Sequence, residues 1–223
     1  PVELLYNRCL RNDHLHLVHL GWVTSWELEY IRRCNVKVTT CPTSNMKLAT
    51  AGHFPLKELL SMGVIVGLGT DGAASSNTLD MFREMKTCIL LQRHSYWSTD
   101  IGVQDVLDMA TLNGGKIFKL PIGRISPNYY ADIICLNIKK PHIQPLRRDN
   151  LLPTLAYTVI GSDVDMVVVH GKILLSESNR EQLLGEALDT ASYLNHKIVD
   201  VLEKVKDSHL THAERPPFNT YSH

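Results

Sequence analysis

The fold class of this chain is decided by the stretch GVIVGLGTDG at residues 63–72. Its unbroken apolar run predicts a strand buried on both faces, as in a parallel sheet covered by helices. The run ends in a carboxylate flanked by glycines, and α/β proteins place catalytic and metal-binding groups at the carboxyl ends of such strands. Asp-Gly is also a common turn pair, so a turn role and a chemical role for Asp71 both stand at this point.

Two further strand-like segments precede this one, and helix-like segments separate the three. Residues 15–19 and 36–40 are rich in apolar and β-branched side chains. Strands that alternate with helices predict βαβ units and a parallel sheet. Right-handed crossovers then bring the strand ends at His19, Thr40 and Asp71 to one edge of that sheet.

Periodicity and turn residues predict the other elements. Residues 41–45 are predicted to be a polar loop, Pro1 suits a first helical turn, and the tail after residue 208 is predicted to be mobile. A capping-box pattern opens the first of the long helices. The predicted helices span 24–34, 55–61, 79–91, 103–118, 152–160 and 181–206. A later strand is predicted at 131–136. Residues 166–175 are predicted to form two strands joined by a hairpin turn at 170–171.

Composition excludes several classes of function. Lys+Arg and Asp+Glu both total 23 in 223 residues, so no basic surplus points to nucleic acid or an anionic membrane surface. No apolar run reaches the ~18 residues that a membrane span needs. The five cysteines, Cys9 among them, are scattered without a CxxC pair, which favours free thiols and a cytoplasmic location. Phosphate-binding glycine motifs and a serine nucleophile elbow are absent from the sequence.

The candidate site residues lie at the three predicted strand ends. His19 ends the first strand, where a hydrogen-bonded structural histidine and a catalytic one are both possible. His16 is an odd number of positions away and faces the opposite side of a regular strand, so the two do not form a chelating pair. We assign substrate binding to Asn45 and Ser75, which lie in the small polar segments after the second and third strands.

Three blocks carry a family resemblance when they are taken together. They are LVH at 17–19, PTSNMKL at 42–48 and GTDGAASSNTLDM at 69–81. Their sequences and spacing resemble the amidohydrolase superfamily, in particular its 5-methylthioadenosine/S-adenosylhomocysteine deaminase-like branch. The resemblance extends to about residue 190, and the third block is its most specific part.

The resemblance implies a fold made of three parts. Residues 1–120 are expected to form the C-terminal portion of a (β/α)8 TIM-type barrel that belongs to a metal-dependent hydrolase. Residues 121–178 are expected to form part of a small composite β-sandwich, and residues 179–223 a C-terminal helix and tail. A full barrel needs about 250 residues, so the barrel portion here is about half of one.

The resemblance also implies a chemistry. Relatives use Zn, or another divalent metal such as Fe, to activate the water that attacks a ring carbon bearing an amino group. Asp71 matches the aspartate after strand eight, which ligates the metal and takes a proton from the water. His19 matches the histidine after strand six, which hydrogen-bonds the water or the substrate.

The family's other metal ligands have no counterpart in this sequence. The His-x-His pair, the strand-five histidine and the nearby glutamate are absent, so three of four expected ligands must come from outside the chain. We therefore expect the chain alone to be inactive, and expect an N-terminal half of the same enzyme or a homo-oligomer as its partner.

The leading interpretation is a metal-dependent hydrolytic deaminase of a purine nucleoside-type small molecule, such as methylthioadenosine or S-adenosylhomocysteine. Two alternatives stay open. The first is a non-catalytic remnant that serves as a binding or assembly module. The second is a related hydrolase that acts on guanine or an s-triazine.

Overall fold

The computed structural model of the protein describes residues 2–8, 12–50 and 52–207. The predictions made for Pro1, Cys9 and the tail from residue 208 fall outside the described residues. The chain divides into two compact units, residues 1–175 and residues 176–223.

The first unit contains a parallel sheet of three strands. β1 (His16–Val18), β2 (Lys37–Thr40) and β3 (Val66–Leu68) pair in the order β1-β2-β3. Val38 and Val66 lie opposite each other in this register, and both are fully buried. The α/β fold and the parallel sheet predicted from residues 63–72 are confirmed.

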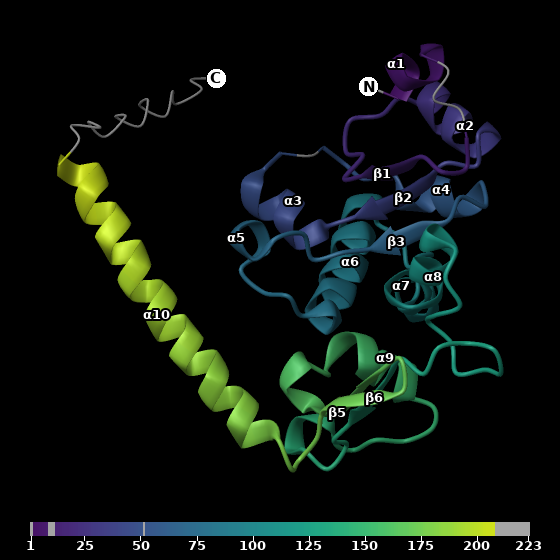
Figure 1. Cartoon of the computed structure of the whole chain (residues 1–223). Helices are drawn as coiled ribbons and strands as arrows, with labels where there is room; N and C mark the ends of the chain where they lie inside the picture. Colours follow the sequence, from purple (N-terminus) through teal and green to yellow (C-terminus); the bar gives the residue numbers. More distant parts are fainter. Residues whose placement is uncertain (1, 9–11, 51, 208–223) are drawn as a thin grey trace. The chain divides into compact units, whose positions relative to one another are not determined.

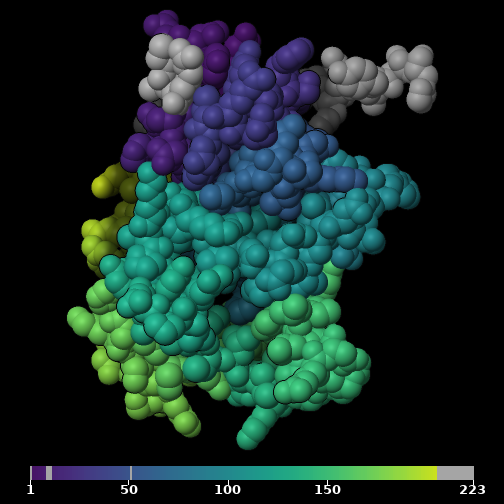
Figure 2. Space-filling view, turned by 90° about the vertical axis from the view of Figure 1, so that its right-hand side faces the viewer, coloured from purple at the N-terminus to yellow at the C-terminus, as the bar shows by residue number. Residues whose placement is uncertain are grey.

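Helices alternate with the strands and pack around the sheet. They are α1 (Val2–Asn7), α2 (Ser25–Arg33), α3 (Pro42–Leu48), α4 (Leu56–Ser61), α5 (Ala73–Ser76), α6 (Met81–Tyr96), α7 (Val103–Ala110) and α8 (Leu112–Phe118). The apolar core includes fully buried Leu59 of α4, Ile89 of α6 and Val106 of α7, which places these helices against the sheet. Figure 2 shows that the segment drawn in teal, which includes α7 and α8, covers much of one face.

The capping box of α2 forms as its sequence predicts. The Thr24 hydroxyl accepts a hydrogen bond from the Glu27 N–H at 3.3 Å, and the Glu27 carboxylate accepts one from the Thr24 N–H at 2.9 Å. Each bond satisfies a backbone N–H that has no partner within the helix. A pattern that is complete within four residues is therefore sufficient to start this helix.

The prediction of a polar loop at 41–45 is wrong, because α3 begins directly after β2. Pro42 occupies the first helical position, where its fixed φ suits the helix and its missing N–H costs nothing. Ala49 then ends the helix with a left-handed backbone at φ 50°. Figure 1 shows α3 beside α5 at the carboxyl end of the sheet, and the two helices are in contact.

The single helix predicted over 103–118 is in fact two. Thr111 leaves the helical region at φ −131° and ψ −87°, and it separates α7 from α8. Gly123, at φ +83°, passes so close that a Cβ on it would lie 2.4 Å from the Thr111 carbonyl oxygen. The helix breaks where the backbone of this later turn approaches it.

The second sheet of this unit is antiparallel. β4 (Ile133–Leu136), β5 (Val164–Val169) and β6 (Lys172–Leu175) pair in sequence order. The predicted hairpin turn is confirmed, with His170 and Gly171 both at positive φ, as a tight two-residue turn requires. The preceding helix α9 (Leu151–Tyr157) packs against α6 and α7.

The described residues of the second unit, 176–207, contain one long helix, α10 (Arg180–Asp207), and the prediction of a helix over 181–206 is confirmed. Its apolar residues Leu184, Leu188 and Ile198 are exposed. No helix in the described part of the chain has the length and hydropathy of a membrane span.

Candidate functional site

The candidate site lies at the carboxyl ends of the three parallel strands. His19 follows β1 and Asp71 follows β3, while Ser44 and Asn45 lie on α3, which follows β2. The backbone is strained at both strand ends, since His19 has φ 72°, Leu20 has φ 47° and Asp71 has φ 60°. Non-glycine residues adopt this left-handed region uncommonly, and such strain is concentrated at functional sites.

Hydrogen-bond donors hold the exposed Asp71 carboxylate. The Ser44 hydroxyl donates to Oδ2 at 2.6 Å, and the Gly72 N–H donates to Oδ1 at 2.7 Å. These bonds, with smaller contributions from the Ser75 hydroxyl and the nearby His19, lower the pKa of Asp71 below its usual value. Asp71 is therefore a fixed, ionised and accessible carboxylate.

The His19 ring is oriented by Asn45. The carbonyl oxygen Oδ1 of the buried Asn45 side chain lies 2.8 Å from His19 Nδ1 and accepts a hydrogen bond from the Nδ1–H. In the neutral ring, this bond places the proton on Nδ1 and leaves the lone pair on Nε2. His16 has a different partner, because its Nε2 lies 2.7 Å from the Thr39 hydroxyl.

A second set of bonds connects α3 to the loop around Asp71. Lys47 Nζ donates to the Ala74 carbonyl oxygen at 3.0 Å and to the Asn77 side chain. The Ser75 hydroxyl donates to the Gly72 carbonyl oxygen at 2.9 Å. The structure thus brings His19, Asp71 and Asn45 together through α3 and places Ser75 beside them on α5.

Cys41 is the buried residue that immediately precedes α3. Burial, followed by the charges of Asp71 and Glu84, raises the pKa of its thiol to about 11. The thiol is therefore protonated at neutral pH in the absence of a metal, and it is not an activated nucleophile.

Asp71 is one potential metal ligand without a complete ligand set around it. Within the described residues, no group of three or more His, Cys, Asp or Glu side chains is placed to hold a metal ion. Structural and catalytic zinc sites use at least three protein ligands. The described residues can therefore contribute to a metal site but do not complete one.

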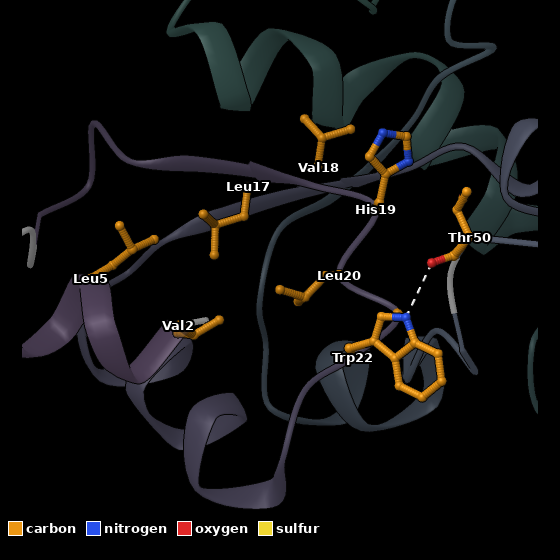
Figure 3. Close-up of a pocket in the computed structure, with 9 residues that line it drawn as sticks. Val2, Leu5, Leu17, Val18, His19, Leu20, Trp22 and Thr50 are labelled. Atoms are coloured by element: carbon orange, nitrogen blue, oxygen red, sulfur yellow. Dashed lines mark hydrogen bonds between the residues drawn. The ribbon is translucent and has the colours of Figure 1, made fainter. Parts of the chain in front are cut away.

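An apolar pocket borders His19 (Figure 3). Its volume is about 300 Å³, and its walls come from α1, from β1 and from the loop that follows β1. In that loop, Trp22 Nε1 donates to the Thr50 carbonyl oxygen at 3.1 Å, which fixes the indole at the rim. Apolar pockets that carry a few oriented polar groups are typical of small-molecule sites.

Sequence reasoning missed two residues near this site. Ser44 lies within the motif at 42–48 but was expected only to be part of a loop, and nothing local indicates that it contacts Asp71. Glu84 is fully buried on α6 and its Oε2 accepts the Thr43 N–H at 3.2 Å. Its position four residues before the buried Cys88, on the apolar side of the helix, is the one signal that could have identified it.

The family of the chain follows from a comparison with family models. The amidohydrolase family model matches residues 1–174, and the chain therefore belongs to the amidohydrolase family. This confirms the resemblance drawn from the three sequence blocks.

Curated relatives are named as deaminases. The chain is 43% identical over 184 residues to 5'-deoxyadenosine deaminase of Methanothermobacter thermautotrophicus, a match that covers 82% of the chain and 42% of the relative. It is 40% identical over 194 residues to 5-methylthioadenosine/S-adenosylhomocysteine deaminase of Pyrococcus furiosus. This match covers 84% of the chain and 46% of the relative. The chain thus spans less than half the length of these relatives.

A solved structure shares the fold. An adenosine deaminase from Xanthomonas campestris with bound zinc superposes with a TM-score of 0.77 at 30% identity. The match covers 88% of this chain and 46% of that one. The similarity thus includes most of the described chain but about half of the solved protein.

Proposed function

We propose that this chain forms part of a metal-dependent hydrolytic deaminase of adenosine-type nucleosides. The observation that carries the proposal is the pairing of an ionised Asp71 and an oriented His19 at the carboxyl ends of parallel strands. Relatives named as deaminases, at 40–43% identity over most of the chain, support the reaction and the substrate class.

We further propose that residues 1–120 are the C-terminal portion of a (β/α)8 barrel. The parallel order β1-β2-β3, with a helix after each strand, supports this assignment. Residues 121–178 would then contribute part of a β-sandwich, and residues 179–223 a helix and tail.

The chemistry of Asp71 fits a share of a zinc or iron site. It is an ionised carboxylate, exposed and held in place by two donors, and carboxylate oxygens are common zinc ligands. A bound divalent metal would lower the pKa of water to about 7. We propose that the remaining ligands lie outside this chain, in an N-terminal half of the enzyme or in a second subunit.

The side chains of this chain have separate roles in the proposed reaction. The Asp71 carboxylate takes a proton from the attacking water, as a base fixed by Ser44. His19 Nε2 accepts a hydrogen bond from the water or the substrate, because Asn45 holds the proton on Nδ1. We assign substrate contacts to Asn45 and Ser75, and the apolar pocket beside His19 can accept an uncharged part of the nucleoside.

We also propose a cytoplasmic location. The cysteines among the described residues, Cys34, Cys41, Cys88 and Cys135, are free thiols, which suits a reducing compartment.

The proposed function is tested by measuring ammonia release with zinc present. The substrates are 5'-deoxyadenosine, methylthioadenosine, S-adenosylhomocysteine and adenosine, with guanine and an s-triazine as the alternatives. The chain is assayed alone and within the complete enzyme proposed above, with an N-terminal half or a second subunit; this complete enzyme is called the full-length protein below. We expect zinc-dependent release from an adenosine-type substrate in the full-length protein, and its loss in Asp71→Asn but not in the matched control Asp189→Asn, which changes an exposed carboxylate of α10.

Two outcomes would overturn the proposal. Full activity of Asp71→Asn would remove the base from the mechanism. Release from guanine or the triazine alone would assign the chain to the related hydrolases instead.

A further inference from the structure

Helix α3 carries the side chains that hold both candidate catalytic residues, yet it lacks a local cap. Cys41 precedes its first turn and makes no side-chain hydrogen bond to it. The first N–H groups of a helix have no intrahelical acceptor and need one from elsewhere. The acceptor for the Thr43 N–H is Glu84 Oε2, at 3.2 Å and 41 residues later in the chain.

Supplying that acceptor from Glu84 requires the burial of a carboxyl group, which costs free energy. Its side chain is fully buried, and its second oxygen, Oε1, has no hydrogen-bond partner among the described residues. Leaving a buried polar atom unsatisfied costs roughly 1–3 kcal/mol. An apolar side chain would avoid that cost at Oε1 but would leave the Thr43 N–H without its acceptor. The carboxyl group is therefore retained for the hydrogen bond that it accepts from the first turn of α3.

We propose that Glu84 is a positioning residue that fixes the first turn of α3 through the Thr43 N–H. The next two residues along the helix, Ser44 and Asn45, hold Asp71 and His19. A shift of this turn would therefore displace both hydrogen bonds together. The expected effect on catalysis rests on the proposed deaminase function. The positioning of α3 by Glu84 does not.

The Oε2 atom of Glu84 acts here as a hydrogen-bond acceptor. Burial, which outweighs the Thr43 hydrogen bonds, raises the pKa of Glu84, and the nearby Asp80 charge acts in the same direction. Glutamine keeps an oxygen acceptor of the same reach without a charge. Glu84→Gln is thus the conservative variant, and Glu84→Met removes the acceptor while retaining an unbranched side chain of similar length.

Gln92 provides a matched control two turns further along α6. It is almost fully buried, its Nε2 donates to the Phe54 carbonyl oxygen at 3.3 Å, and its Oε1 is also without a partner among the described residues. Gln92→Met therefore perturbs the same helix to a similar degree without touching the first turn of α3.

The test compares these variants by NMR on this chain. In Glu84→Met, we expect the Thr43 amide proton to exchange with solvent at least 10-fold faster than in the unaltered chain. We also expect the ring nitrogen signals of His19 to shift. Glu84→Gln should restore both readouts, and Gln92→Met should leave both unchanged. If Glu84→Met does not fold, Glu84→Asp keeps the carboxyl but shortens its reach by one methylene, and it should show the same two changes.

The inference is overturned if Glu84→Met leaves the Thr43 exchange and the His19 signals as they are, or if Gln92→Met alters them equally. In the full-length protein, we expect Glu84→Met to lower kcat about 10–100-fold, the usual effect of losing a supporting hydrogen bond, with a smaller change in KM. Altered NMR signals without any nucleoside deamination would contradict the proposed function alone. Full activity of Glu84→Met would contradict this inference alone.

Discussion

The Ser44 hydroxyl lies 2.6 Å from Asp71 Oδ2 and donates a hydrogen bond to it, although the two residues are 27 positions apart and follow different strands. The bond joins α3 to the end of β3 and is the first cause of the lowered pKa of Asp71. It fixes the rotation of the carboxylate and leaves the other lone pairs of both oxygens available. A ligand or base must be held in this way before its substrate arrives.

Ser44→Ala should lower deaminase activity without unfolding the protein. The variant removes the donor, so the Asp71 side chain gains freedom, and we expect kcat to fall about 10-fold or more. The unfolding midpoint should change little, since Asp71 is exposed. Ammonia release and urea unfolding are measured together, with Ser61→Ala, an exposed serine of α4, as the control. Unchanged activity would show that Ser44 does not support the carboxylate.

Asn45→Ala should release the His19 ring. Without the carbonyl oxygen at 2.8 Å, the proton is no longer held on Nδ1, and both tautomers become populated. We expect kcat to fall about 10–100-fold. The ring nitrogen signals of His19 report the tautomer directly. The exposed Asn195→Ala on α10 is the control, and a single Nδ1–H tautomer in Asn45→Ala would contradict the assignment.

Sequence reasoning succeeded where the determining contacts are local. The capping box of α2 is complete within Thr24 and Glu27, and the apolar run that forms β3 indicates its burial by itself. The hairpin at 170–171 is likewise set by two adjacent residues. In each case the pattern and the structure it specifies occupy the same few positions.

Sequence reasoning failed where contacts between residues far apart in the sequence determine the local structure. The start of α3 reads as a loop because its acceptor, Glu84, is 41 residues away. The break at Thr111 lies where Gly123 approaches the helix, and no local pattern indicates that approach. His19 and Asp71 could be placed at one sheet edge from topology, but Ser44, which holds Asp71, could not be identified without the tertiary structure.

Thr24→Ala should destabilise the first unit by about 1 kcal/mol. The substitution removes the side-chain acceptor that caps α2, and N-cap losses of this kind fall in that range. Thr24→Ser keeps the hydroxyl and should restore most of the stability. Urea unfolding at constant m-value measures both variants. Equal destabilisation by Ser and Ala would mean that the methyl group of Thr24, rather than its hydroxyl, matters.

Asp163, directly before β5, is a fully buried carboxylate that has Lys140 and His142 as partners. Lys140 Nζ lies 2.9 Å from Oδ1 and His142 Nε2 lies 3.0 Å from Oδ2, to which the Ile160 N–H also donates at 3.0 Å. Burial acts to raise the pKa of Asp163, but the hydrogen bonds from His142, Ile160 and Lys140 outweigh it and lower the pKa to about 2. The ionised form is therefore the one that the fold stabilises.

Asp163→Asn should destabilise the protein by about 1–3 kcal/mol at pH 7, because it leaves the partners of a buried carboxylate incompletely satisfied. The pKa of Asp163 is lower in the folded state than in the unfolded state. Its contribution is thus fully present above the usual value of 3.8 and is lost as the pH falls toward 2. The stability difference between the unaltered chain and Asp163→Asn, measured by urea unfolding, should therefore shrink between about pH 4 and pH 2. A difference that stays constant across this range would mean that the Asp163 charge does not stabilise the fold.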